Sequence, residues 1–171
     1  MTYTLDTLAA DIRKELSGDS ATAKAAVCRH VSRALTDTEF LTTHLKDRPA
    51  GSDPREILYE DPKLGFCICA HVYDGKAIGS PHDHGSSWAI YGQATGVTEM
   101  TEWRIVEKGE AGKPSLVEPV RTYLMHPGDV QFYDVGDVHS PKREAPVKLI
   151  RVEGKNLDHV KRSNIKAKAL V

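Results

Sequence analysis

A pair of histidines, His82 and His84, constrains the possible folds of this chain more than any other feature. A third histidine, His139, stands much later in the sequence. The pair stands in the run Gly-Ser-Pro-His-Asp-His-Gly at residues 79–85, and the third histidine ends the run Gly-Asp-Val-His at residues 136–139. Side chains two positions apart on a β-strand point to the same face, so we expect His82 and His84 side by side. Three imidazoles that converge from two strands make a metal site with open coordination positions. The pattern favours a fold in which distant strands meet around a metal ion.

The bulk composition narrows the class of protein. The 171 residues are enough for one substantial hydrophobic core and too few for two. The net charge of −1, from 23 basic and 24 acidic residues, does not favour nucleic acid or an anionic membrane as a partner. Because the chain has no apolar run long enough to span a bilayer and no targeting signal, we expect a cytoplasmic protein. The odd cysteine count predicts reduced thiols at Cys28, Cys67 and Cys69.

The order of patterns along the chain predicts a helical cover followed by a barrel. Apolar spacing predicts helices over residues 5–16, from Ala23 to Leu35 with Ser20 as a candidate cap, and over residues 39–45. Short β-rich runs separated by Gly, Pro and Asp then predict an antiparallel sandwich or barrel. These runs cover residues 56–59, 66–73, 88–93, 97–106, 120–125, 130–132 and 147–152.

The domain prediction is a single unit over residues 1–171. Residues 1–50 form the helical N-terminal cover and residues 55–153 the β-barrel. Residues 154–171 are rich in lysine and arginine, and we expect a solvated or frayed basic tail there rather than an arm that binds phosphate.

The spacing of the histidines resembles the two cupin motifs, G-x5-H-x-H-x3,4-E-x6-G and G-x5-P-x-G-x2-H-x3-N. The positions that keep this spacing are His82, His84, Gly96, Gly128, Gly136 and His139. Three positions depart from it. Ala89 stands in place of the usual glutamate ligand, Asp134 in place of the proline and Arg143 in place of the asparagine.

A three-histidine set without the glutamate resembles the thiol dioxygenases, the cysteine dioxygenase and 3-mercaptopropionate dioxygenase family. Residues 81–85 followed by Trp88 are similar to bacterial members, as is the run 55–62 that leads into a strand at Phe66. The resemblance covers roughly residues 5–153. It implies a mainly β fold, the cupin double-stranded β-helix (jelly-roll barrel) with N-terminal α-helices packed against it. It also implies Fe(II) held by the three histidines.

One part of the family pattern is missing. Thiol dioxygenases resemble one another in a Ser-His-Tyr relay on the strand after the third metal histidine, and no Ser-x-His-x-Tyr occurs in this chain. Aligning residues 144–152 with that strand puts Lys148, Ile150 and Val152 at the relay positions. The cysteine that crosslinks to the tyrosine in animal members falls at Ala89, so that crosslink is absent as well.

Other residues are candidates for the catalytic roles. If Ala89 points inward, strand alternation turns Tyr91 inward too, where its hydroxyl can donate a hydrogen bond to a bound oxygen. His71 shares one strand face with Cys69 and Tyr73 and is a candidate acid–base residue, the alternative being a hydrogen-bonded wall histidine. Arg55 lies one position from the arginine that binds the substrate carboxylate in the family, and a guanidinium suits a carboxylate. The alternative for Arg55 is a surface residue beside acidic neighbours.

Together these patterns predict an enzyme, a mononuclear non-haem Fe(II) dioxygenase that oxidises a small carboxylated thiol of the cysteine or 3-mercaptopropionate type to a sulfinate. Its partners are the thiol and O2, with no nucleic acid and no membrane. Two alternatives stay open. One is a three-histidine cupin with Zn, Mn or Ni that runs hydrolysis, isomerisation or carbon–carbon cleavage, and the other is a non-catalytic cupin that binds a small acid.

Overall fold

The structure is a computed structural model that describes residues 2–18, 21–110 and 112–169. Three helices come first: α1 (Leu5–Leu16), α2 (Ala23–Leu35) and α3 (Thr38–His44). The candidate cap Ser20 lies outside the described residues, and the residue at the N-cap position of α2 is Thr22. No helix in the described part of the chain is long and apolar enough to cross a lipid bilayer.

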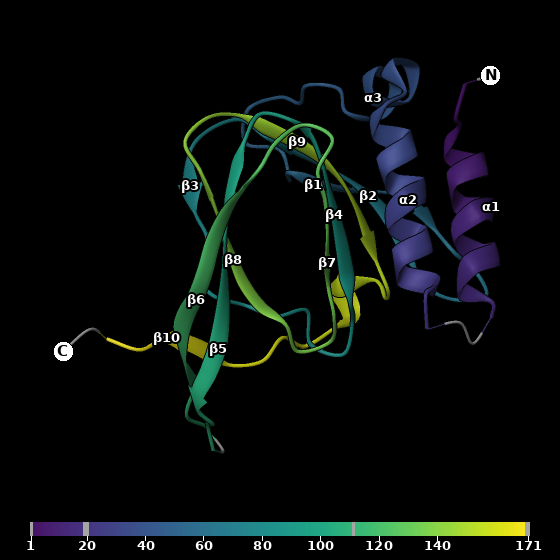
Figure 1. Cartoon of the computed structure of the whole chain (residues 1–171). Helices are drawn as coiled ribbons and strands as arrows, with labels where there is room; N and C mark the ends of the chain where they lie inside the picture. The colour runs from purple at the N-terminus through teal and green to yellow at the C-terminus, as the bar shows by residue number, and fades with distance from the viewer. Residues whose placement is uncertain (1, 19–20, 111, 170–171) are drawn as a thin grey trace.

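The strands form two five-stranded sheets that face each other and close into a barrel (Figure 1). Sheet A has the order β1 (Arg55–Glu60), β2 (Cys67–Tyr73), β9 (Val147–Glu153), β4 (Ala89–Thr95) and β7 (Val130–Tyr133). Sheet B has the order β10 (Ile165–Ala167), β6 (Ser115–Met125), β5 (Thr98–Glu107), β8 (Val138–Arg143) and β3 (Ala77–Ile78). Neighbouring strands are antiparallel except β10 and β6, which are parallel. The predicted fold class, a mainly β double-stranded β-helix with N-terminal helices, is confirmed.

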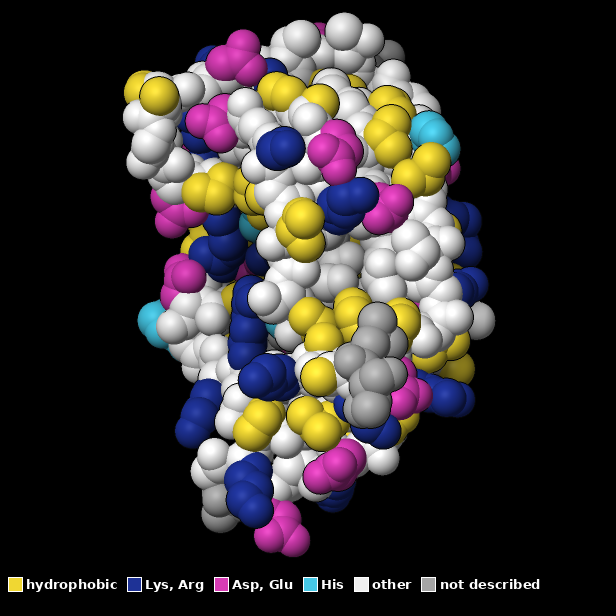
Figure 2. Space-filling view, turned by 90° about the vertical axis from the view of Figure 1, so that its left-hand side faces the viewer, with side chains coloured by type: hydrophobic (Ala, Val, Ile, Leu, Met, Phe, Trp, Pro, Cys, Tyr) yellow, Lys and Arg dark blue, Asp and Glu magenta, His cyan; other side chains and the backbone are white. Residues whose placement is uncertain are grey.

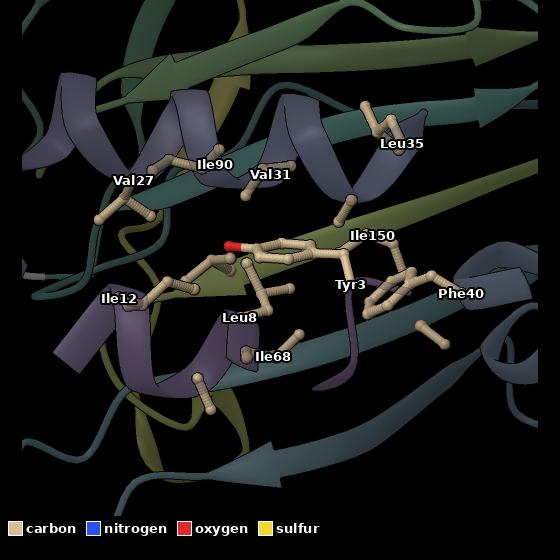
Figure 3. Close-up of a cluster of buried hydrophobic side chains, with 14 of the residues drawn as sticks. Tyr3, Leu8, Ile12, Val27, Val31, Leu35, Phe40, Ile68, Ile90 and Ile150 are labelled. Carbon is tan, nitrogen blue, oxygen red and sulfur yellow. The ribbon is translucent and has the colours of Figure 1, made fainter. Parts of the chain in front are cut away.

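The helices cover the outer face of sheet A, because each helix has one apolar stripe and this face is apolar too. Figure 3 shows Ile68, Ile90 and Ile150 from the sheet packed against Leu8 and Val31 from the helices. At Gly92 of β4 the contact is close enough that an added Cβ would lie 2.6 Å from a methyl group of Val31. The largest hydrophobic cluster therefore lies outside the barrel, between sheet A and the helices.

Sheet B has a different environment, since none of the described helices covers it. Figure 2 shows this side of the molecule, where hydrophobic side chains are scattered among charged ones and Lys and Arg gather in a column along one side. Ile78, Ile105, Val120 and Leu124 are exposed residues of its strands. Among the described strands, those buried on both faces along most of their length are β2, β4 and β9 of sheet A.

The register of β9 corrects the alignment made from the sequence. Ile150 and Val152 face the helices, where they belong to the outer hydrophobic cluster. Leu149 and Arg151 instead line a cavity inside the barrel. Ile150 and Val152 therefore do not face the barrel interior, and the inward positions of β9 include Leu149 and Arg151 instead.

The segment after β9 is also different from the prediction. Residues Leu157–His159 form a 3₁₀ turn, and β10 then pairs with β6 on the other sheet. The chain crosses from one sheet to the other beneath the barrel in the view of Figure 1. The segment is thus not frayed over residues 154–169, but its lysine and arginine side chains are exposed to solvent, as expected, and residues 170–171 lie outside the described part.

Candidate metal centre

A two-sided backbone hydrogen bond brings the distant histidines together. The amide of His82 donates to the carbonyl of His139 at 3.0 Å, and the amide of His139 donates to the carbonyl of His82 at 3.0 Å. One potential ligand atom from each of His82, His84 and His139 lies within 4.8 Å of the others. The three predicted metal ligands therefore form one cluster at the start of β8.

Local hydrogen bonds orient the ring nitrogens. Nδ1 of His82 lies 2.9 Å from the carbonyl oxygen of Ser80, and Nδ1 of His139 lies 3.3 Å from that of Asp137. A neutral imidazole that donates from Nδ1 leaves an acceptor lone pair on Nε2. Nδ1 of His84 is buried and has no hydrogen-bond partner. The hydrogen bonds of His82 and His139 are typical of metal-binding histidines, whose second ring nitrogen bonds to a backbone carbonyl.

The electrostatics of the cluster keep the rings neutral. Burial lowers the pKa of all three histidines. Burial and the neighbouring His82 bring the pKa of His139 to about 3, and burial together with His139 brings that of His84 well below its ordinary value. Neutral imidazoles suit Fe(II), Zn(II) and other first-row divalent metals, so the donor set fits a transition-metal ion.

The backbone around the histidine pair is held by the segment that follows β9. The carboxylate of Asp83 accepts hydrogen bonds from the amides of Gly85 and Ser163, both at 3.0 Å. Gly85 has a φ of +58°, and a Cβ there would collide with the carbonyl oxygen of Lys161. A glycine is required at this position by the backbone conformation and by the passing chain.

Tyr91 lies beside two of the three histidines. Its Oη is 2.9 Å from Nε2 of His84 and 3.2 Å from Nε2 of His139. Nη1 of Arg151 donates to the same oxygen at 3.2 Å. The ring of Tyr133 stacks on His139 with 3.9 Å between centroids, and its own hydroxyl bonds to Tyr123 instead.

Behind Tyr91 the inner face of sheet A carries a row of paired charges. Arg151 donates from Nε to Glu153 at 2.8 Å, and Arg55 donates from Nη2 to the same carboxylate at 2.8 Å. Nη1 of Arg55 donates a hydrogen bond to Oδ1 of Asp158 at 2.9 Å. Burial raises the pKa of Glu153, but the two guanidinium groups outweigh it and hold this pKa below its ordinary value. The row thus keeps Arg151 beside Tyr91 with its charge balanced.

A cavity of about 150 Å³ adjoins the histidine cluster inside the barrel. His82 and Tyr91 line the end next to the metal ligands. Its cationic residues are Arg143, Arg151 and Arg162. The neutral polar residues of the wall are Tyr73, Gln93 and Thr98, and the apolar ones are Met100, Met125, Pro141 and Leu149. This is a small pocket with several cationic groups, next to a potential metal site.

The remaining predicted residues lie near this pocket but not in its wall. Arg55 is bound to Glu153 and Asp158, so its carboxylate-binding role stays a prediction. His71 is buried, and its Nδ1 lies 3.0 Å from the hydroxyl of Tyr73, which does line the pocket. Burial and the surrounding arginines lower the pKa of His71 strongly, so its ring is neutral, and its acid–base role stays a prediction.

Three arginines of the pocket were missed. Strand alternation gives Arg151 an inward position once the register of β9 is known. Arg143 was noticed only as a departure from the asparagine of the second motif. Nothing local distinguishes Arg162, because it reaches the pocket from a segment that first crosses between the sheets.

Comparisons with known proteins give remote structural similarities only. No family model and no curated protein matches this chain. Solved structures that are similar to it include a cupin superfamily protein from Desulfitobacterium hafniense, at 9% identity over 65% of this chain and 84% of that chain, with a TM-score of 0.47. A protein with a double-stranded β-helix domain from Klebsiella pneumoniae is 14% identical over 70% of this chain and 85% of its own, with a TM-score of 0.48. KdgF from Halomonas sp. is 17% identical over 67% and 94%, with a TM-score of 0.45. None of these three is a thiol dioxygenase by name, and the first two are named as a cupin superfamily protein and as a protein with a double-stranded β-helix domain.

Proposed function

We propose that this protein is a metal-dependent dioxygenase that oxidises a small thiol carboxylate, of the cysteine or 3-mercaptopropionate type, to a sulfinate with O2. The observation that carries the proposal is the pocket that begins at His82 and Tyr91 and is lined by three arginines. It puts a recognition site for a small anion directly beside three neutral histidines that fit a metal.

The size of the pocket supports a small substrate. About 150 Å³ equals the liquid volume of roughly five water molecules. A molecule with one sulfur, one carboxylate and two or three carbons is of this order. The apolar wall formed by Met100, Met125 and Leu149 suits the methylene groups and excludes water from the reacting end.

The charges of the pocket support an anionic substrate. Arg151 is neutralised by Glu153, but neither Arg143 nor Arg162 has an acidic partner among the described residues. Arg143 lies over the ring of Tyr73, with 3.8 Å between guanidinium carbon and ring centroid, and its buried Nε has no hydrogen-bond acceptor. A carboxylate would supply that acceptor and compensate the charge. We therefore favour Arg143 and Arg162 over Arg55 as the groups that hold the substrate carboxylate.

The chemistry fits the donor set. An Fe(II) ion at three neutral imidazoles supplies one-electron chemistry with dioxygen and favours an anionic sulfur donor. In the overall reaction R–S⁻ + O2 gives R–SO2⁻, so both oxygen atoms end on sulfur and no external reductant is needed. Arg143 and Arg162 hold the carboxylate end of the substrate, and this directs the sulfur toward His82. The side chain of Tyr91 closes the pocket at the reacting end.

A second candidate keeps the metal and changes the reaction. The inner face of β9 carries Leu149 and Arg151 where thiol dioxygenases have members of the Ser-His-Tyr relay. This departure favours an isomerase, hydrolase or carbon–carbon lyase that uses Zn(II), Mn(II) or Ni(II) on a small carboxylated substrate.

The test is anaerobic reconstitution with Fe(II), followed by oxygen uptake with cysteine, 3-mercaptopropionate and their sulfur-free analogues alanine and propionate. We expect thiol-dependent uptake and a sulfinate with a mass 32 Da above the thiol, since two oxygen atoms are added. His82→Ala should abolish both, whereas His126→Ala, which changes an exposed histidine outside the cluster, should preserve them. Retention of another metal with no uptake for any thiol would contradict the proposal and favour the second candidate.

A further inference from the structure

The protons carried by Tyr91, His84 and His139 cannot give every buried nitrogen of the two rings a hydrogen-bond partner. Nε2 of His139 is an acceptor, because its Nδ1 faces the carbonyl of Asp137. If His84 is protonated on Nδ1, its Nε2 and that of His139 compete for the single proton of the Tyr91 hydroxyl, and the Nδ1 proton has no acceptor. If His84 is protonated on Nε2, its buried Nδ1 has no donor. Either arrangement leaves a buried nitrogen unsatisfied, and a cation held at the two Nε2 atoms would remove their competition for the proton of Tyr91.

The distances around Tyr91 match neighbouring positions in one coordination sphere. Metal–nitrogen and metal–oxygen bonds of about 2.1 Å that meet at a right angle separate their donor atoms by about 3.0 Å. The oxygen of Tyr91 lies 2.9 Å from Nε2 of His84 and 3.2 Å from Nε2 of His139. These distances are compatible with the two nitrogens and Oη of Tyr91 as neighbouring donors to one cation.

Burial raises the pKa of Tyr91 above its ordinary value and the neighbouring Arg151 opposes this only in part, so a phenolate here requires a bound cation as well. Nη1 of the buried Arg151 donates to Oη of Tyr91 at 3.2 Å, and this guanidinium carbon lies 5.2 Å from the centroid of the ring. A phenolate at this point would accept the hydrogen bond from Arg151 in its charge-assisted form. Ala89, two residues earlier on the same face of β4, leaves the site without a carboxylate ligand.

We propose that Tyr91 is a fourth protein ligand of the metal, joining His82, His84 and His139 through its phenolate oxygen. On binding, the O–H bond of the phenol breaks, an oxygen–metal bond forms, and the proton leaves to solvent. No oxidant or reductant takes part in the step. The inference rests on the metal site of the proposed function and is independent of the thiol substrate.

The test is the visible spectrum of the Fe(III) form, prepared by anaerobic loading with Fe(II) and oxidation. A phenolate bound to Fe(III) gives a charge-transfer band in the visible region, which histidine ligands alone do not produce. We expect this band in the wild type and its loss in Tyr91→Phe. Tyr133→Phe is the matched control, because Tyr133 stacks on His139 while its hydroxyl bonds to Tyr123. That variant should keep the band.

Affinity gives a second readout. Loss of one ligand should weaken Co(II) binding by about 10-fold or more in Tyr91→Phe and leave it unchanged in Tyr133→Phe. If Tyr91→Phe does not fold, resonance Raman spectra of the wild type with ring-deuterated tyrosine still decide the point, since modes of a bound phenolate shift with the label. A wild type that binds one metal per chain without band or shift would overturn the ligand role and leave the metal site intact. A wild type that binds no metal would overturn both.

Discussion

The two faces of sheet A are built from the same strands and hold opposite kinds of side chain. On β9, Ile150 and Val152 face the helices, whereas Leu149, Arg151 and Glu153 face the barrel interior. The outer contacts are apolar and non-directional, so they contribute stability roughly in proportion to the area they bury. The inner contacts are directional, because each polar group needs a partner at a set distance.

The two faces of sheet A have separate roles, since the outer face contributes stability and the inner face holds the polar groups of the candidate site. The helical layer supplies a hydrophobic cluster outside the barrel, so the interior need not be filled with apolar side chains. The interior is then free to hold histidines, arginines and a cavity. Strand alternation joins the two roles, since a slip of one residue in register would exchange the faces.

The largest effect should come from removing a charge on the inner face. Arg151→Met leaves the buried carboxylate of Glu153 with Arg55 as its remaining cation, which should cost about 3–5 kcal/mol of unfolding free energy. Urea unfolding followed by circular dichroism measures it. Arg121→Met is the control, because the pair of Arg121 with Glu102 is exposed on sheet B and worth about 1 kcal/mol or less. Equal losses for the two variants would break the contrast between buried and exposed charges.

The residue before Arg151 tests the outer face. Ile150→Ala opens a cavity between sheet A and the helices and should cost about 2–5 kcal/mol. Because the side chain points away from the histidines, the folded variant should have the same metal content as the wild type. Elemental analysis of the purified variant checks this. A loss of metal at temperatures where Ile150→Ala is fully folded would show that the two faces are not independent.

Acid should weaken the polar link between the helices and sheet A. Burial raises the pKa of Asp61, but hydrogen bonds from the amides of Leu64 and Lys63 and from Arg13 outweigh it and lower this pKa to about 2. The unfolded value is about 3.9, so the stabilisation is complete above pH 4 and is lost as the pH falls toward 2. We expect a loss of about 1–2 kcal/mol over this range. In Asp61→Asn the same pH change should cost less, and an unchanged slope would contradict the account.

The smallest effect concerns the mouth of the pocket. Arg162→Ala should raise KM for the thiol carboxylate by about 10-fold, equivalent to about 1.4 kcal/mol, with metal content unchanged. Arg162→Lys should recover part of this affinity. Lys166→Ala, on the same segment but outside the pocket wall, should leave KM as it is. A similar rise for Lys166→Ala would mean that the segment contributes only general charge.

The sequence was informative where the signal is local. The H-x-H pattern, the third histidine and the glycine spacing predicted the cluster, and alternation from Ala89 predicted that Tyr91 points inward. The apolar spacing of residues 5–16 and 23–35 also predicted α1 and α2.

The misses depend on contacts between distant segments. The register of β9 is set by its pairing with β2 and β4, where Arg151 lies opposite Cys69 and Tyr91. The role of Arg162 depends on Gly85, which lets the chain pass close enough for Asp83 to bind the amide of Ser163. The residues next to these two arginines in the sequence give no sign of either contact, so the sequence did not place Arg151 or Arg162 in the pocket.

A crystal grown with Fe(II) under anaerobic conditions and measured at the iron absorption edge tests the metal site most directly. We expect a single anomalous peak about 2.1 Å from one nitrogen each of His82, His84 and His139. A pocket that holds a thiol carboxylate should then show its density between the metal and Arg143. An iron-loaded crystal with no peak at the three histidines, or with its peak elsewhere, would contradict the central claim.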